Sequence, residues 1–145
     1  MKNQHTATLA GYEIPRLGMG TMALAIEGRP TNRNQAIETI HAALDAGVRY
    51  LDTAWSYYLP SKPGTGEPED MGYGEYLVRD ALNSWHGPKD EVLVATKTGW
   101  LRTLDNHGNY SWQADARPET MIANAKESAQ RLGVETLDLL YSHCN

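Results

Sequence analysis

The sequence contains a single cysteine and no phenylalanine among its 145 residues. One cysteine excludes an intramolecular disulfide framework and a cysteine-rich zinc site. No apolar run approaches the roughly 18 residues of a transmembrane helix, and no apolar segment follows the polar residues 1–6, so neither a membrane anchor nor a signal peptide is expected. The net charge of −5 lacks the basic excess of nucleic-acid-binding surfaces. We therefore expect a cytoplasmic protein, with neither membrane nor nucleic acid as partner.

The residues that are present predict alternating helices and strands in one domain, since most domains contain about 100–200 residues. Apolar residues recur at helical spacing in three segments, and glycine or proline marks several of their ends. Short apolar runs between these segments are typical of buried strands. The sequence predicts helices over 33–46, 75–85 and 118–132, and strands over 48–52, 92–96 and 136–141.

The remaining segments are expected to be a hairpin, one more strand and two loops. A turn centred on Gly11 predicts a hairpin over 7–14, and residues 17–24 are expected to form a short buried strand. Residues 59–74 contain three prolines and four glycines, which predicts a loop long enough to have a function. Residues 100–115 are polar and are interpreted as irregular.

The resulting order, β-α-β-α-β-α-β, predicts a parallel sheet, because each helix carries the chain back across one face of the sheet. Asp52, Lys97 and His143 each follow the end of a predicted strand. The carboxyl ends of parallel strands gather catalytic groups in barrels and bind ligands in doubly wound sheets. Three ionisable residues in register are therefore interpreted as a candidate site.

Tyr57, five residues beyond Asp52, adds a fourth group to this site. A phenol beside an ammonium group is a stronger acid, because the cation stabilises the phenolate. A carboxylate would keep Lys97 charged and oriented, and His143 could donate a hydrogen bond to a carbonyl oxygen. These groups together suit proton donation to a carbonyl that receives a hydride.

Five short motifs resemble those of the aldo-keto reductase family. Residues 52–57 (DTAWSY) resemble its D-T-A-x-x-Y, residues 95–97 (ATK) its T-K strand end, and residues 138–143 (DLLYSH) its D-x-x-x-x-H strand. Residues 18–22 (GMGTM) are similar to its G-x-G-T, and residues 74–82 are similar to its G-x-x-E-x-x-V-x-x-A-L helix, with a shorter spacing from glycine to glutamate.

The resemblance implies an α/β fold of the (β/α)8 TIM-barrel type. Residues 1–145 would form its N-terminal half, with a hairpin, about four strands, three helices and no second domain. It also implies an NADPH-dependent oxidoreductase (NADH is possible) that reduces an aldehyde or ketone to an alcohol. The partner is then a small-molecule carbonyl substrate, and no metal is expected.

The resemblance also assigns roles to the candidate residues. It implies that Tyr57 is the proton donor and that His143 orients the carbonyl. Asp52 and Lys97 would adjust the acidity of the donor. The positions that match the nicotinamide end of the family's cofactor site are Gly20, Thr21, Met22 and Asp52.

Several neighbouring residues have more than one interpretation. Tyr58 directly follows Tyr57, and only the motif spacing favours Tyr57. Trp55 and Trp100 are expected to line an apolar substrate pocket, and packing over the barrel mouth would explain them equally well. Cys144 is interpreted as a small buried apolar residue. The charged side chains of the last helix are expected to form a solvated face: Arg117, Glu119, Lys126, Glu127 and Arg131.

The length of the chain leaves two other hypotheses open. In the family, most groups that hold the adenosine phosphate lie on strands five to eight. We therefore expect a fragment with weak or absent NADPH binding and activity on its own. The alternative is a non-catalytic binding or regulatory subunit derived from the barrel. Two unpaired sheet edges also predict a homo-dimer or aggregation.

Overall fold

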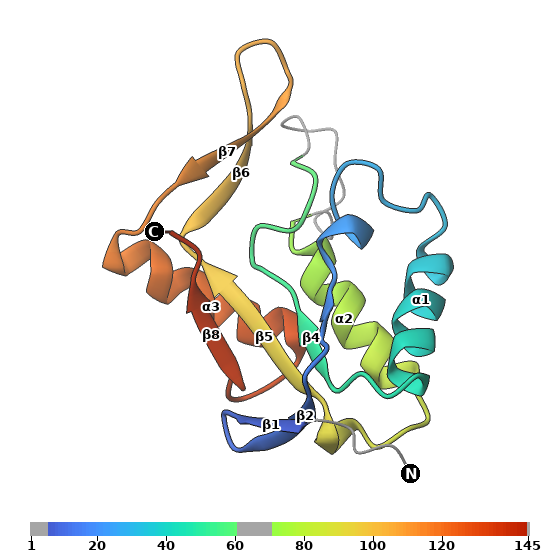
Figure 1. Ribbon diagram of the computed structural model, residues 1–145. Helices are drawn as coiled ribbons and strands as arrows, with labels where there is room; N and C mark the ends of the chain where they lie inside the picture. The colour runs from blue at the N-terminus through green and yellow to red at the C-terminus, as the bar shows by residue number, and fades with distance from the viewer. Residues whose placement is uncertain (1–5, 61–70, 145) are drawn as a thin grey trace.

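Four strands form a parallel sheet, and two antiparallel hairpins lie outside it (Figure 1). The computed structural model describes residues 6–60 and 71–144. The sheet has the order β3-β4-β5-β8, with bounds Met19–Gly20, Tyr50–Asp52, Leu93–Thr98 and Leu139–Ser142. The hairpins pair β1 with β2 and β6 with β7, with bounds Thr6–Leu9, Tyr12–Pro15, Trp100–Leu104 and Tyr110–Ala114.

Three helices connect the strands, and their ends follow from local sequence. They are α1 (Arg33–Asp45), α2 (Tyr73–Ser84) and α3 (Pro118–Leu132). Helix α3 begins with Pro118. Proline lacks an N–H group, and this costs no hydrogen bond here because N–H groups in the first turn of a helix have no partner within the helix. Gly133 closes α3 with a positive φ of 73°, a conformation that glycine adopts without a steric penalty. Two short 3-10 helices, η1 (Met22–Leu24) and η3 (Lys89–Glu91), complete the described elements.

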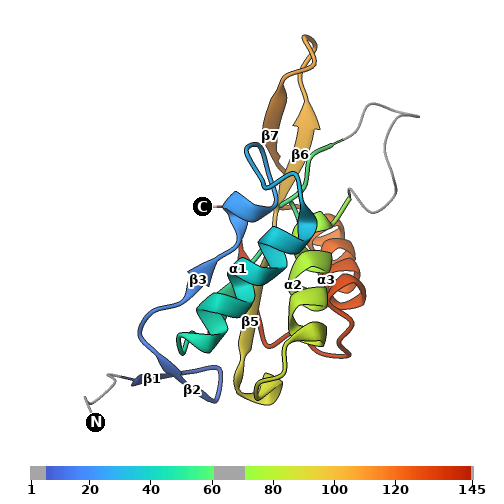
Figure 2. The same cartoon turned by 90° about the vertical axis from the view of Figure 1, so that its right-hand side faces the viewer.

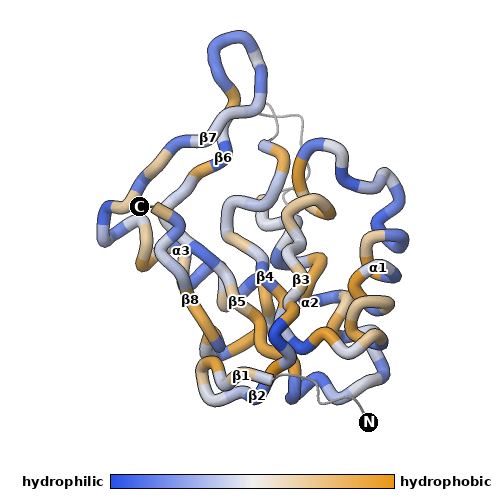
Figure 3. The backbone as a smooth tube through the Cα atoms, viewed as in Figure 1, coloured by the Kyte–Doolittle hydropathy of each residue, from blue (hydrophilic) through white to orange (hydrophobic). Residues whose placement is uncertain are grey.

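The helices cover one face of the sheet (Figure 2). The side of each helix that faces its neighbours carries small and apolar residues, and these meet the apolar strands in one core. Figure 3 shows this concentration of hydrophobic residues on the strands, in contrast to the hydrophilic tip of the β6–β7 hairpin. The buried core residues are Ala36, Ile40, Leu44, Leu51, Leu77, Val78, Ala81, Trp85, Val92 and Leu132.

The predicted α/β class, parallel sheet and N-terminal hairpin are confirmed. The predicted strand over 17–24 is wrong in extent, since β3 contains only two residues and η1 follows it. Leu17 is 79% exposed, so this segment is not a buried strand. Of the predicted loop over 59–74, residues 61–70 lie outside the described residues. Within the described part of the chain, no helix has the length and apolarity needed to cross a membrane.

The prediction that residues 100–115 are irregular is wrong, because they form the β6–β7 hairpin. Large side chains alternate along both strands, and the five-residue connection contains Gly108 at a φ of 80°. Both features are typical of a hairpin with a short glycine-containing loop. Asp105 holds the turn, because its side chain accepts backbone N–H groups of His107 and Asn109 at 2.8 Å each.

Candidate active site

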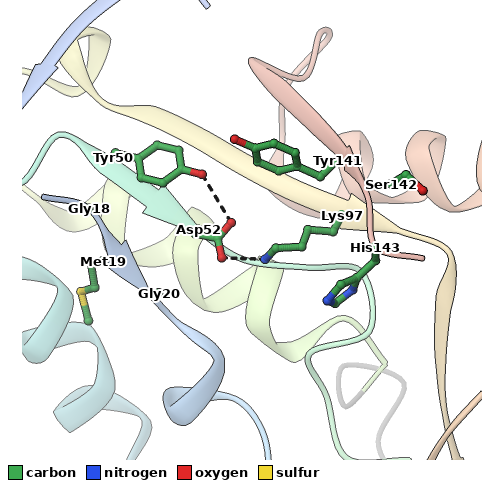
Figure 4. Close-up of a pocket in the computed structure, with 9 residues that line it drawn as sticks. All are labelled: Gly18, Met19, Gly20, Tyr50, Asp52, Lys97, Tyr141, Ser142 and His143. Carbon is green, nitrogen blue, oxygen red and sulfur yellow. Dashed lines mark hydrogen bonds and ion pairs between the residues drawn. The ribbon is translucent and has the colours of Figure 1, made fainter. Parts of the chain in front are cut away.

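The carboxyl ends of β4 and β5 bring Asp52 and Lys97 together (Figure 4). Lys97 Nζ donates to Asp52 Oδ2 at 2.6 Å, to the Thr53 carbonyl oxygen at 2.8 Å and to the Tyr57 hydroxyl at 3.2 Å. The Lys97 and Asp52 side chains are 15% and 26% exposed. The ammonium group therefore lies between a carboxylate and a phenol, at the edge of solvent.

The N-terminus of α2 fixes the position of Tyr57. The Gly74 N–H group donates to the Tyr57 carbonyl oxygen at 2.9 Å. A Cβ atom at residue 74 would lie 2.8 Å from that oxygen and 2.9 Å from the Tyr57 Cβ. Only glycine fits this contact, so a helix that starts 16 residues later in the chain holds the tyrosine from behind.

The adjacent Tyr58 points into the protein instead. Its hydroxyl donates to the Arg102 carbonyl oxygen at 3.2 Å, and its side chain is fully buried. Burial raises the pKa of Tyr58, and the hydrogen bond to that carbonyl and the charge of Arg131 oppose the increase. The structure thus places Tyr57, and not Tyr58, beside Lys97.

His143 completes the cluster from the segment after β8. Its backbone N–H group donates to the Thr98 carbonyl at 2.7 Å, and the Trp100 indole N–H donates to its carbonyl at 2.8 Å. Its ring centroid lies 6.0 Å from that of Tyr57 in an edge-to-face arrangement. Burial and the charge of Lys97 lower the pKa of His143, so the ring is neutral at neutral pH. Its Nδ1 atom is buried without a hydrogen-bond partner among the described residues.

A groove of about 550 Å³ runs along the sheet face that carries Asp52 and Lys97 (Figure 4). Gly20 forms one side of this groove, and a Cβ atom there would meet open space. Tyr50 lies on the groove wall, where burial raises the pKa of its hydroxyl. The groove is lined by Gly18, Met19, Gly20, Tyr50, Asp52, Lys97, Tyr141, Ser142 and His143.

The two residues that follow Gly20 lie outside this groove. Thr21 is fully buried, and its hydroxyl donates to the Asp52 carbonyl oxygen at 3.1 Å. Thr21 therefore joins η1 to the end of β4. The Met22 side chain is 45% exposed and lines a second cavity.

This second cavity, of about 350 Å³, lies against Tyr57 and has mainly aromatic walls. Trp100 and Trp112 come from opposite strands of the β6–β7 hairpin, with ring centroids 6.5 Å apart in an edge-to-face arrangement. The sequence offered no role for Trp112, because the segment was interpreted as a loop. The cavity is lined by Met22, Tyr57, Trp100, Trp112 and His143.

Trp55 lies elsewhere, which corrects its expected place in the substrate pocket. Its side chain is buried, and its indole N–H donates to Glu127 Oε2 of α3 at 2.8 Å. The Arg131 guanidinium carbon lies 5.0 Å from the centroid of the Trp55 ring. Trp55, in the loop after β4, therefore points toward the helix layer and anchors the segment that carries Tyr57.

The expected solvated face of α3 is also wrong for Arg131, which belongs to a buried charge cluster. Arg131 Nη1 lies 3.3 Å from Glu75 Oε2, and its Nη2 lies 3.3 Å from Glu127 Oε2. Glu75 is fully buried and accepts the Thr96 hydroxyl at 2.6 Å. Burial raises the pKa of Glu75, and the hydrogen bond from Thr96 and the charge of Arg131 oppose that increase. These contacts tie α2 and α3 to the rear of β5.

Cys144 is half-buried rather than fully buried, with its Sγ atom at the Gly99 carbonyl oxygen. Within residues 6–60 and 71–144, no group of three histidine, cysteine, aspartate or glutamate residues is placed to hold a metal ion.

Three relatives show how far the likeness to known proteins extends. The chain is 33% identical to a D-threo-aldose 1-dehydrogenase of a Pseudomonas species, over 94% of this chain and 42% of that protein. It is 32% identical to the aldo-keto reductase YhdN of Bacillus subtilis, over 92% of this chain and 35% of that protein. A solved structure, the glycerol dehydrogenase AKR11B4 from Gluconobacter oxydans, superimposes with a TM-score of 0.73 at 28% identity, over 95% of this chain and 38% of that one.

The chain thus spans less than half the length of the curated relatives it matches. Its strands and helices correspond to part of the barrel in the solved structure, which agrees with the predicted half barrel. The model of the Aldo/keto reductase family matches residues 16–145, which include every strand of the parallel sheet and the cluster around Lys97. The chain therefore belongs to the aldo-keto reductase family.

Proposed function

We propose that this chain supplies the proton-donating half of an NAD(P)H-dependent carbonyl reductase, with Tyr57 as the proton donor. The observation that carries the proposal is the position of Lys97 Nζ, 2.6 Å from the Asp52 carboxylate and 3.2 Å from the Tyr57 hydroxyl. A fixed cation beside a phenol favours loss of the phenolic proton. The substrate is an aldehyde or ketone, which is reduced to an alcohol.

The residues of the chain account for the proton side of this reaction. As hydride reaches the carbonyl carbon, the carbonyl oxygen gains negative charge and takes the Tyr57 proton. Lys97 stabilises the phenolate left behind, and Asp52 keeps the lysine in place. Neutral His143, which faces the same cavity as Tyr57, can donate an imidazole N–H to the carbonyl oxygen and orient it. The phenolate regains its proton from solvent.

The groove beside Asp52 suits the nicotinamide end of the cofactor, which supplies the hydride when bound. The groove is open at Gly20, where the missing side chain leaves room for a flat ring. Among the described residues that line it, Lys97 alone is cationic, and Asp52 already pairs with that charge. Nothing in this groove suits a pyrophosphate. We therefore expect the isolated chain to bind NADPH weakly, and full activity to need a complete barrel.

The relatives support an oxidoreductase rather than a non-catalytic subunit. Those named above include a dehydrogenase of an aldose and a dehydrogenase of glycerol, and a dehydrogenase is an oxidoreductase. All four groups that this chemistry needs are present here. The aromatic cavity beside Tyr57 adds room for a carbonyl compound of modest size.

The test uses this chain completed to a full barrel by fusion to the C-terminal part of the Bacillus subtilis relative. Cooperative unfolding is checked first, and the oxidation of NADPH by benzaldehyde is then followed. Tyr57→Phe removes the donor and should lower kcat by about 100-fold or more. Tyr58→Phe is the matched control, because it removes a buried hydrogen bond from the adjacent residue and should leave kcat nearly unchanged.

Three results would refute the proposal. A folded fusion that oxidises no NADPH would contradict the assigned reaction. Retention of activity by Tyr57→Phe would contradict the assigned donor. A loss in Tyr58→Phe as large as that in Tyr57→Phe would show that folding of the loop, and not the phenol of Tyr57, limits the rate.

A further inference from the structure

The β6–β7 hairpin carries an arginine between aromatic rings on the face that includes the cavity wall. Register pairs Arg102 with Trp112 and Leu104 with Tyr110, so these side chains share one face of the two strands. The guanidinium carbon of Arg102 lies 4.2 Å from the centroid of the Trp112 ring and 5.3 Å from that of Tyr110. Both distances are within the range of cation–π attraction.

Arg102 also connects the hairpin to the other side of the cavity. Its Nη2 atom pairs with Glu27, which follows η1 and therefore lies near Met22 along the chain. Its carbonyl oxygen accepts the hydroxyl of Tyr58, the residue after Tyr57. One side chain and its backbone thus join three segments around the cavity: the η1 segment, the loop after β4 and the hairpin.

Arg102 is unusually enclosed for a residue in a projecting hairpin. Its side chain is 2% exposed, whereas that of Glu27 is 43% exposed. Its Nε atom is buried without a hydrogen-bond partner among the described residues. An unsatisfied buried donor is unfavourable, and proteins keep such groups mainly where another requirement outweighs that cost. The guanidinium of Arg102 lies against the ring of Trp112.

We propose that Arg102, clamped by Glu27, is a positioning residue that holds Trp112 as a wall of the substrate cavity. This inference rests on the proposed carbonyl reductase function and adds a specificity determinant to it. Trp112 and Trp100 then present ring edges and faces to a substrate ring next to Tyr57. The residue pair thereby favours aromatic carbonyl compounds, whose rings can pack against Trp112, over short aliphatic ones.

The experiment compares benzaldehyde with acetaldehyde in the completed barrel. Arg102→Met should raise the KM for benzaldehyde by about two- to tenfold, the range expected for loss of one aromatic contact. The KM for acetaldehyde and both kcat values should change by less than about twofold, because neither the proton donor nor its lysine is altered. Glu27→Gln keeps the guanidinium and should produce a smaller change in the same direction.

The matched control is Arg49→Met at the opposite end of the sheet. Arg49 also lies over a tryptophan, with its guanidinium carbon 5.2 Å from the Trp85 ring centroid, and it pairs with Glu91 at 3.4 Å. It is remote from the cavity and should leave both KM values unchanged. An increase in the KM for benzaldehyde equal to that of Arg102→Met would overturn the proposal.

A second readout separates this inference from the proposed function. Trp112 emission is obtained from the fluorescence difference between each protein and its Trp112→Phe counterpart, without cofactor or substrate. Glu27→Gln and Arg102→Met should shift this emission to longer wavelength, because the indole, which is 36% exposed, loses its packing and contacts more water. Unchanged Trp112 emission in folded variants would overturn the clamp, even if the parent enzyme is active. A shifted emission in an inactive parent would support the clamp while refuting the reductase.

Discussion

Two charge clusters lie on opposite sides of strand β5, and they differ in solvent exposure and in proposed role. Lys97 of β5 faces the groove and contacts Asp52 and Tyr57 at the edge of solvent. Its neighbour Thr96 faces the helices, where its hydroxyl donates to the fully buried carboxylate of Glu75. The alternation of side chains along a strand thus separates reactive charges from structural ones by a single residue.

Because the two clusters differ in exposure, they should respond differently to substitution. Partly exposed ion pairs contribute little to stability, because water screens the charges and competes for their hydrogen bonds. Breaking a buried pair leaves an uncompensated charge in the core, which costs about 3–5 kcal/mol. We therefore expect the rear cluster (Glu75, Thr96, Glu127 and Arg131) to have the larger effect on the free energy of unfolding. The front cluster (Asp52, Tyr57, Lys97 and His143) should have the larger effect on the rate of the proposed reaction.

The largest effect on stability is expected for Arg131→Met, which leaves the buried Glu75 carboxylate without its cation. The free energy of unfolding should fall by about 3–5 kcal/mol, measured by urea denaturation. A double variant that also carries Glu75→Gln should recover part of this loss, because the unpaired charge is gone. A loss below about 1 kcal/mol for Arg131→Met would show that the pair behaves like one at the surface.

The next effect is expected at the contact between α2 and the loop that carries Tyr57. Gly74→Ala places a methyl group 2.8 Å from the Tyr57 carbonyl oxygen and should destabilise the protein by about 1–3 kcal/mol. Gly20→Ala is the control, because its methyl group would meet open space. Equal midpoints of thermal unfolding for the two variants would contradict the role of Gly74.

The smallest effect is expected from His143, whose protonation should make the free energy of unfolding depend on pH. Burial and Lys97 lower the pKa of its folded state below the ordinary value of 6.5. Above pH 6.5 the ring is neutral in both states, so folding carries no penalty. As the pH falls from 6.5 toward the lower folded pKa, the unfolded state takes up the proton first and the free energy of unfolding decreases.

Urea denaturation between about pH 7.5 and pH 5 measures this slope. His143→Gln should flatten it, whereas His107→Gln at the exposed hairpin turn should leave it unchanged. Equal slopes in the parent and in His143→Gln would show that another group causes the acid sensitivity.

The sequence predicted the front cluster because its members occupy equivalent positions on successive strands. Asp52, Lys97 and His143 are separated by about 45 residues each, and strand periodicity alone places them at one edge. The choice between Tyr57 and Tyr58 needed the structure, because adjacent residues in a loop have no fixed direction. The contact with Lys97 shows that the hydroxyl of Tyr57, and not that of Tyr58, belongs to this cluster.

The burial of Arg131 could not be predicted, because its buried partner Glu75 is distant in sequence and lies on another helix. Arg131 is charged and lies on an amphipathic helix, so a solvated position was the natural interpretation. Its partner Glu75 is 56 residues away. Burial of a charged residue depends on a partner that tertiary structure supplies, and no local pattern shows it.

The hairpin was missed for a different reason, since a local signal was present. Trp100, Arg102 and Leu104 alternate with smaller or aliphatic residues, and Tyr110 and Trp112 continue the pattern after a turn that contains glycine. The polar residues 105–109 favour a loop, and for that reason the whole segment 100–115 is interpreted as irregular from sequence. Large side chains recur at every second residue both before and after this turn, and that alternation indicates two strands.

Substitutions at Lys97 and at Thr96 test most directly whether the two faces of β5 have different roles. We would measure the single-turnover rate of benzaldehyde reduction in the completed barrel for Lys97→Met and Thr96→Val, at saturating NADPH. We predict that Lys97→Met lowers this rate by about 100-fold or more, whereas Thr96→Val changes it by less than about threefold and lowers stability instead. Similar rates for the two variants would contradict the claim that β5 carries the reactive charge on one face and the structural contact on the other.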